Sequence, residues 1–393
     1  MRNLYQSKLE SFYSQNKRMP TYSEMIKLFG FKSKNAVFRV VEKLIEAAKV
    51  SHRNKAFSQA LLVQAGSLLD GNYEKAQIAW LKVQPYILNI VIGPVERVED
   101  NLMFIKRSYQ AWVGVMNRNI THRVNVLKDV VYSARQRTSL PVSEKVDFIQ
   151  KAKLRVDDTV IFAGMIANYN YTATTLTNDI NLLEKHGSEA WIFMPSVREN
   201  FEKRHYPLFN LIFAAHFKSS FDKDTLFRGY LLMVSMHEIA RIVVRYRFAV
   251  ERLKELWPVF NELTIEALAV KMAGTLHIKD FISQKEMEAL LVMFMTRLFD
   301  GFSNAKSSSD GMQPLILGNA ILLNSLVDSG AVQISKEGIS WPNFTKMFIG
   351  VSNLADSMER VIAEGSYMDA KHYLDNHSTR AIFKRFPLLK ALQ

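Results

Sequence analysis

The sequence predicts an α+β protein that is predominantly helical, with a small basic head and a much larger body. Of its 393 residues, 48% are hydrophobic and 23% are charged, which is typical of a globular chain with packed cores. From about residue 207 onward, apolar residues recur almost wholly at helical spacing, whereas residues 86–200 mix helical and strand-like segments. We expect a head at 1–57, a linker at 58–81 and a body at 82–393.

Positive charge is concentrated in the head. Residues 1–57 contain twelve Lys or Arg and four acids, a net charge of +8, whereas the other 336 residues share the remaining +5. A basic segment on a nearly balanced body is typical of a module that binds nucleic acid. The alternative that charge alone leaves open is a solvated basic surface.

The composition excludes several kinds of chemistry. The absence of cysteine rules out disulfides, thiolate metal sites and a cysteine nucleophile. No glycine-rich nucleotide motif occurs, and we expect no cofactor. The first residues lack the apolar core of a signal peptide, and charges interrupt the apolar stretch from Leu226 to Val250, which therefore indicates a buried helix. We expect a cytoplasmic protein that does not bind membranes.

The head begins with the pattern of two helices. Residues 3–16 place their apolar side chains on one helical face. Thr21 and Glu24 then form a capping-box pattern before a helix from Tyr22 to Phe29, which Gly30 ends.

A further helix follows, from Ser33 to about Ala48, and Val50–Arg53 could begin a wing. This order predicts a winged helix-turn-helix. The run MPTYSEMIKLFGFKSKNA resembles the amino-terminal domain of the LexA repressor family, which implies binding of double-stranded DNA by a homodimer. A winged helix used for protein contacts is the alternative. The DNA-binding residues that we expect are Lys32, Ser33, Lys34, Asn35, Ala36, Phe38, Arg39 and Arg53.

The body alternates strands and helices before its helical second half. We expect connecting structure at 58–80, a strand from Tyr86 to Ile92, and further β segments at 159–162 and 190–194. A polar loop at 303–311 and a short hairpin at 332–341 interrupt the later helices.

A His-Glu pair, His237 and Glu238, lies on an apolar helix, and Glu262 follows on the next. A zinc hydrolase helix needs two His on one face and a Glu that activates water. No second His lies one turn on, because Arg241 and Ile242 occupy those positions. The pair alone is therefore weak support for a metal site.

Several segments resemble, in one consistent order, the dipeptidyl-peptidase III family of zinc exopeptidases. They are IGPVERVED, NDINLLEKHGSEAWIF, HEIARI and NELTIE, and the likeness extends over about residues 86–376. The resemblance implies a two-lobed peptidase fold. It also implies roles for five residues: His237 as first zinc ligand, Glu238 as general base, Glu262 as carboxylate ligand, and Glu96 and Asn178 as holders of a peptide's amino terminus.

The departures from that family's pattern concern the same site. Ile242 stands at the second zinc histidine, and one His with one Glu cannot hold catalytic zinc. Other family positions are replaced by Val98, Thr175, Leu315 and Asn319. The resemblance therefore implies an inactive peptidase domain with vestigial zinc ligands.

Together these features lead us to expect a DNA-binding transcriptional regulator. Its body would sense a peptide or small-molecule effector, dimerise, or do both. The alternative is a metal-dependent peptidase or other hydrolase with a rearranged site and an accessory DNA-binding head.

Overall fold

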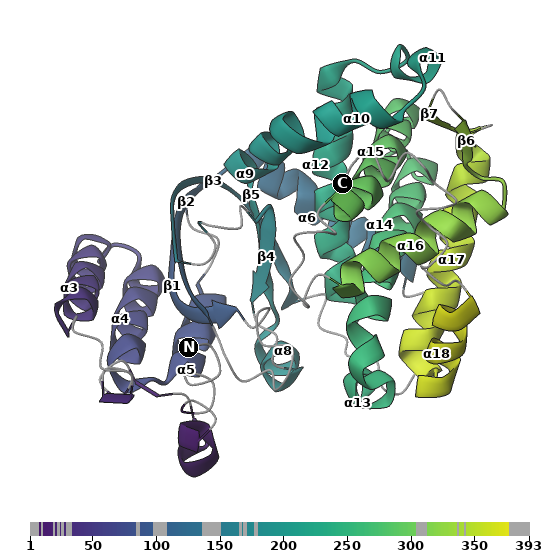
Figure 1. Cartoon of the computed structure of the whole chain (residues 1–393). Helices are drawn as coiled ribbons and strands as arrows, with labels where there is room; N and C mark the ends of the chain where they lie inside the picture. The colour runs from purple at the N-terminus through teal and green to yellow at the C-terminus, as the bar shows by residue number, and fades with distance from the viewer. Residues whose placement is uncertain are drawn as a thin grey trace. The chain divides into compact units, whose positions relative to one another are not determined.

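The computed structural model forms two compact units (Figure 1). Unit 1 comprises Met1–Arg118 and Arg155–Trp191, and unit 2 comprises Asn119–Leu154 and Ile192–Gln393. The structure describes residues 8, 11–18, 20, 21, 24, 27, 28, 34–83, 87–96, 108–135, 151–164, 167, 171–176, 180–303, 313–335, 338–341 and 343–376.

Three helices open the well-described part of unit 1: α3 (Lys34–Val50), α4 (Lys55–Asp70) and α5 (Tyr73–Leu81). The apolar stripe of α3 is buried against α4, and α4 in turn packs on α5. Asn54 caps α4 by accepting a hydrogen bond from the Phe57 amide at 3.1 Å. The connecting structure that we expected at 58–80 is therefore wrong, because α4 and α5 fill that segment with packed helix.

The head agrees with the sequence at its cap and differs at its wing. The capping box is confirmed: the Thr21 amide donates to Glu24 Oε2 at 2.7 Å, and the Glu24 amide donates to Thr21 Oγ1 at 3.3 Å. The strand expected at Val50–Arg53 is absent. Helix α3 includes Val50, and a tight turn leads directly to the capped start of α4.

The strands β1 (Leu88–Glu96), β2 (Ser108–Met116), β3 (Lys153–Gly164), β4 (Ala173–Leu176) and β5 (Glu189–Phe193) form one sheet in the order β1-β2-β3-β5-β4. Strand β2 pairs antiparallel with both β1 and β3. Trp112 of β2 and Trp191 of β5 are fully buried and meet edge to face, with ring centroids 5.4 Å apart. The strands predicted near 86–92, 159–162 and 190–194 are confirmed.

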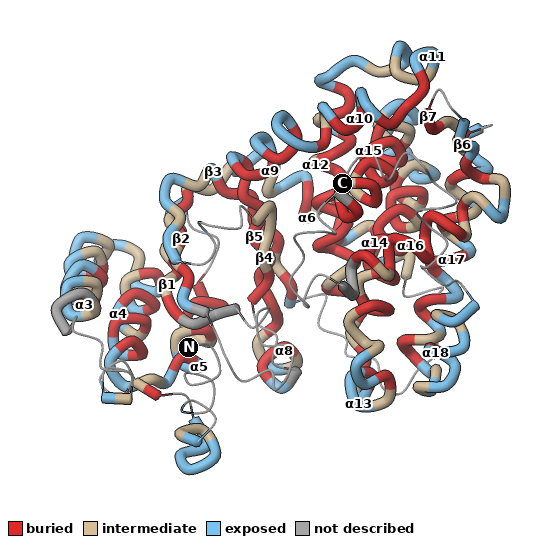
Figure 2. The backbone as a smooth tube through the Cα atoms, in the orientation of Figure 1, coloured by how far each residue is buried: buried red, intermediate tan, exposed pale blue. Residues whose placement is uncertain are grey.

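Unit 2 is built around α12 (Lys223–Val243), α14 (Trp257–Ile278) and α15 (Gln284–Ser303). These helices are buried along most of their length (Figure 2). Gly229 allows α12 to approach α15, because a Cβ atom there would lie 2.5 Å from the Ala289 carbonyl carbon.

Around this centre lie α6 (Arg118–Arg135), α9 (Met194–Asn200), the π-helix η2 (Phe201–His205), α10 (Tyr206–Ile212), α13 (Ala249–Leu253), α16 (Gln313–Asp328), α17 (Phe344–Glu364) and α18 (Tyr367–Asn376).

The second half of the chain follows the sequence pattern closely. The predicted hairpin is confirmed as β6 (Gln333–Ser335) and β7 (Gly338–Ser340), which pair antiparallel. The apolar stretch near 226–250 forms the buried helix α12 only as far as Val243, and residues 244–248 beyond it are not helical. None of the described helices has both the length and the apolar character needed to cross a lipid bilayer. The α+β, mostly helical class is confirmed, whereas the part of the head that the structure describes shows no wing.

Candidate functional site

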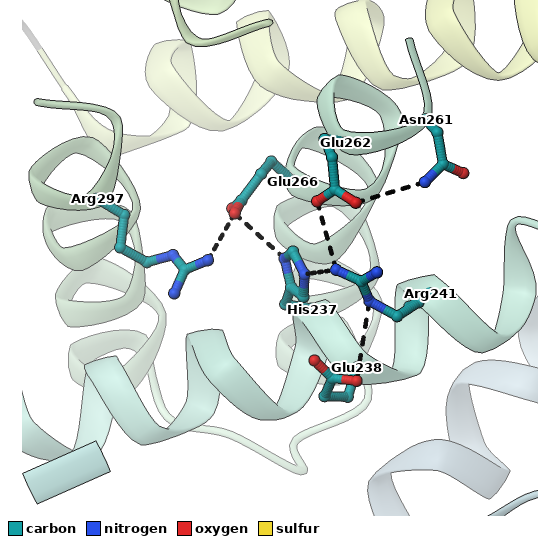
Figure 3. A network of polar contacts seen from close by, with 7 residues as sticks. All are labelled: His237, Glu238, Arg241, Asn261, Glu262, Glu266 and Arg297. Atoms are coloured by element: carbon teal, nitrogen blue, oxygen red, sulfur yellow. Dashed lines mark hydrogen bonds and ion pairs between the residues drawn. The ribbon is translucent and has the colours of Figure 1, made fainter. Parts of the chain in front are cut away.

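Three helices of unit 2 bring six charged or ionisable side chains together (Figure 3). Helix α12 supplies His237, Glu238 and Arg241, within a little more than one turn of each other. Helix α14 supplies a pair one turn apart, and α15 supplies one arginine. The remaining three are Glu262, Glu266 and Arg297. We call these six residues the α12–α14–α15 cluster.

The Arg241 guanidinium lies at the centre of the cluster. Its Nη2 atom lies 2.9 Å from His237 Nε2 and 3.4 Å from Glu262 Oε2, and its Nε atom lies 3.9 Å from Glu238 Oε2. A guanidinium can only donate hydrogen bonds, so His237 Nε2 is the acceptor of this one. One cation therefore contacts all three residues to which the family resemblance assigns zinc binding and base catalysis.

A second, deeper group holds the other side of the histidine. Glu266 Oε1 lies 2.6 Å from Arg297 Nη2 and 3.2 Å from His237 Nδ1, although this second contact lacks the alignment of a hydrogen bond. Burial opposes ionisation of Glu266, but Arg297 and His237 outweigh it and hold the pKa of this carboxyl below its ordinary value. Glu266 is therefore an ionised carboxylate inside the protein.

The cluster has an accessible side and a buried side. The side chains of Arg241 and Glu262 keep 30% and 26% of their exposure, whereas those of Glu238 and Glu266 keep only 6%. Solvent therefore reaches Arg241 and Glu262, whereas Glu238 and Glu266 are almost fully covered.

The cluster does not fit a zinc ion. The two members to which the family resemblance assigns zinc binding are His237 and Glu262, but the Arg241 guanidinium lies between them. Ile242, at the position of the second zinc histidine, is buried and apolar. Among the described residues, no group of three or more His, Asp or Glu side chains is placed to hold a metal ion, and the chain has no cysteine. Catalytic zinc needs three protein ligands.

The two residues expected to hold a peptide's amino terminus are only partly visible. Glu96 ends β1, opposite Ser108 of β2, and only its backbone is described. Asn178, like Val98, lies outside the described residues. The role of Glu96 and Asn178 stays a prediction.

The other departures from the family pattern are structural where they are described. Thr175 is buried on β4, and the side chain of Leu315 on α16 lies outside the described part. Asn319 is buried on α16, and its amide donates to the Leu298 carbonyl at 3.1 Å. Asn319 therefore supports the packing of α16 on α15.

The expected DNA-reading residues give no interface that the structure describes. Lys32 and Ser33 lie outside the described residues, as do the side chains of Lys34, Asn35 and Ala36. Phe38 is 50% exposed, and Arg39 and Arg53 are also exposed.

Part of the head's positive charge is used within the head itself. Arg18 pairs with Glu24 at 2.7 Å and Lys43 pairs with Glu46 at 2.7 Å. These pairs fit the alternative of a solvated basic surface.

Sequence reasoning missed three members of the cluster: Arg241 as a partner of His237, and Glu266 with Arg297. The signal was present for two of them. Residues four apart share one face of a helix. This spacing predicts that Arg241 lies beside His237, and Glu266 beside Glu262. Arg297 comes from a distant segment, and its spacing carries no signal.

Comparisons with known proteins point to a peptidase fold. The chain is 22% identical to dipeptidyl-peptidase III from Caldithrix abyssi, with a TM-score of 0.78 over 91% of this chain and 68% of that one. For dipeptidyl-peptidase III from Corallococcus sp. strain EGB, the identity is 19% and the TM-score 0.70, over 90% of this chain and 64% of that one.

A further comparison finds a protein named as a hydrolase. Nudix hydrolase 3 from Arabidopsis thaliana is 20% identical over 322 residues, which are 80% of this chain and 41% of the relative. The chain thus spans less than half the length of this relative. No protein-family model matches the chain.

These findings correct our expectation of a DNA-binding transcriptional regulator, which is wrong. The proteins named above are peptidases or a hydrolase, and the LexA-like resemblance of the head has no support. The likeness to the Caldithrix enzyme leaves only 9% of the chain uncovered, about 35 residues. That is fewer than the 57 of the expected head, so the peptidase fold extends into it. The chain therefore has the fold of dipeptidyl-peptidase III.

Proposed function

We propose that the chain is a peptide hydrolase, in the class of its structural neighbours, with a rearranged and metal-free site. The observation that carries this proposal is the place of the Arg241 guanidinium, which contacts His237, Glu262 and Glu238 at 2.9, 3.4 and 3.9 Å. A cation thus lies where the family resemblance expects zinc. The fold likeness supports the peptide as substrate class.

The residues of the cluster supply two parts of a hydrolytic mechanism. The partly exposed guanidinium of Arg241 donates hydrogen bonds to the carbonyl oxygen of the bond to be cleaved, and its positive charge stabilises the oxyanion that forms. Glu238, which is buried, accepts a proton from the attacking water and returns it to the amine nitrogen as the C–N bond breaks, so that a carboxylate and an amine leave. His237 accepts from Arg241 and fixes the guanidinium in place.

We expect this chemistry to be slow. A guanidinium carries a single charge and does not bind water as a ligand, so it cannot lower the pKa of a water molecule as zinc does. The nucleophile must then be generated by Glu238 alone. The turnover should therefore be well below that of a zinc exopeptidase.

The test is hydrolysis of short peptides with a free amino terminus, followed by mass spectrometry in the presence of a chelator. We expect cleavage to persist in the chelator, and Arg241→Gln to reduce its rate by about 10²-fold or more. Glu238→Gln should abolish it. Arg228→Gln is the matched control, because Arg228 is an exposed arginine of α12 whose side chain contacts Thr225.

A second candidate is peptide binding without cleavage. It is favoured by the engagement of Arg241 with both His237 and Glu262, which competes with a substrate carbonyl. Binding that depends on Arg241, without any product, would support this candidate over hydrolysis. Cleavage that the chelator stops and zinc restores would overturn the metal-free proposal.

A further inference from the structure

Arg245 is a second arginine near the cluster, and none of the described residues is its partner. It follows Arg241 by four positions, just past the end of α12 at Val243, where Val244 leaves the helical conformation. Its Nε atom is buried and has no hydrogen-bond partner. Among the described residues its guanidinium forms no ion pair or hydrogen bond. The residue as a whole nevertheless keeps some exposure to solvent.

The surroundings of Arg245 are dense and charged. Burial, and next the positive charge of Arg241, lower the pKa of Arg245 to about 10, against the opposing effect of Glu262 and Glu238. Those two carboxylates have their oxygens near Arg241 instead, at 3.4 and 3.9 Å. Arg245 is therefore a partly buried cation whose donors find no acceptor among the described residues.

A partly buried guanidinium without a partner lowers the stability of the protein unless an anion binds to it. Removing a charge from water carries a penalty that only a partner of opposite charge with good hydrogen bonds repays. A carboxylate suits this role best, because it can accept two parallel hydrogen bonds from one guanidinium. An arginine so close to the centre of a proposed peptide site can therefore contribute to ligand recognition.

We propose that Arg245 binds a carboxylate of a short peptide ligand, with its C-terminal carboxylate as the expected source. This inference rests on the proposed function, since it places the peptide at Arg241. Arg241 is close enough to Arg245 for its charge to affect this side chain, and an extended peptide advances about 3.3 Å per residue. A short extended peptide whose carbonyl group bonds Arg241 therefore also reaches Arg245 with its C-terminus.

The test compares peptides that differ only at the carboxylate. Calorimetric titrations use di-, tri- and tetra-alanine as free acids and as C-terminal amides, with a free amino terminus in both. The free acid of the best length should bind the wild-type protein at least about tenfold more tightly than its amide. In Arg245→Gln this preference should disappear, whereas Arg245→Lys should keep part of it. Arg228→Gln should leave it unchanged.

A third set of peptides distinguishes the source of the carboxylate. Amidated peptides with one glutamate should bind no better than amidated alanine peptides if the C-terminus is recognised. If instead they match the free acids, the carboxylate comes from a side chain.

Two results would overturn this inference and leave the proposed function standing. One is equal binding of the free acid and the amide by the wild type. The other is a preference for the free acid that is unchanged in Arg245→Gln. Binding of neither form would contradict both proposals. Circular dichroism of each variant confirms that it is folded.

Discussion

Replacement of Glu266 by Gln should destabilise unit 2 through electrostatics alone. Glutamine has nearly the same size and shape as glutamate, so the change leaves no cavity. It removes the negative charge that faces Arg297 at 2.6 Å and His237 at 3.2 Å. The Arg297 guanidinium, itself mostly buried, would then lack its counter-ion.

The burial of this pair sets the magnitude. An ion pair on the surface contributes about 0–1 kcal/mol, whereas breaking a buried pair by removing one partner costs about 3–5 kcal/mol. The Glu266 side chain is 6% exposed and that of Arg297 is 20% exposed. Because Arg297 keeps some contact with water, we expect the lower end, about 3 kcal/mol, for Glu266→Gln.

The assay is a double-mutant cycle with Arg297→Gln, measured by urea unfolding and far-ultraviolet circular dichroism. Each single variant should lower the free energy of unfolding by about 3 kcal/mol. The double variant should cost at least about 2 kcal/mol less than the sum, because neither charge is then left alone. Single costs below about 1 kcal/mol, or additive costs, would refute the assignment of a buried pair.

The pH dependence of the same comparison has a defined sign. The pKa of Glu266 is lower in the folded protein than its ordinary value of 4.5. Its contribution is therefore fully present above pH 4.5 and is lost as the pH falls towards the folded-state pKa. The difference in stability between the wild type and Glu266→Gln should shrink below pH 4.5.

Three further predictions test other parts of the structure. Gly229→Ala should lower the free energy of unfolding by about 1–3 kcal/mol, because its Cβ would lie 2.5 Å from the Ala289 backbone. Gly66→Ala on α4, which has open space around it, should instead raise the free energy of unfolding by up to about 1 kcal/mol. Urea unfolding measures both changes. The purified protein should contain well under one zinc per chain by elemental analysis. One zinc per chain in the wild type, lost in His237→Ala, would contradict a metal-free site. Arg245→Met should raise the free energy of unfolding by about 1 kcal/mol, since it removes an unpaired charge, and a loss of stability would count against that reading.

Local patterns in the head were readable from the sequence, but their assembly was not. The Thr21–Glu24 capping box is a short-range signal, and it is present as expected. The prediction that a wing begins at Val50–Arg53 was wrong, because this segment is equally compatible with a helix end followed by a turn. The cap at Asn54, which begins α4, favours the helix end and turn. Net charge misled us further, since it reports on solvation as much as on partners.

The candidate site shows the same division. The sequence singled out His237, Glu238 and Glu262, which the structure brings together around Arg241, and the absence of a second zinc histidine at Ile242 stays a prediction. It did not predict that Arg241 lies between His237 and Glu262, because a missing zinc ligand does not by itself indicate which side chain takes its place. The four-residue spacing from His237 to Arg241 was the available signal. Arg297 could not be predicted, since it depends on how α15 packs against α12 and α14.

In the proposed function a guanidinium takes the place of a metal ion, and this has two linked consequences. A zinc ion dissociates when its ligands are protonated or a chelator competes for it, whereas an arginine is tethered to the chain and stays charged at any ordinary pH. The positive charge at the centre of this cluster therefore does not depend on the availability of a metal ion. The same exchange removes the ion that activates water, so the chemistry depends on Glu238 and on hydrogen bonds from Arg241. Insensitivity to chelators and slow turnover thus have one cause, and they should be found together: rapid hydrolysis that needs a metal would contradict both.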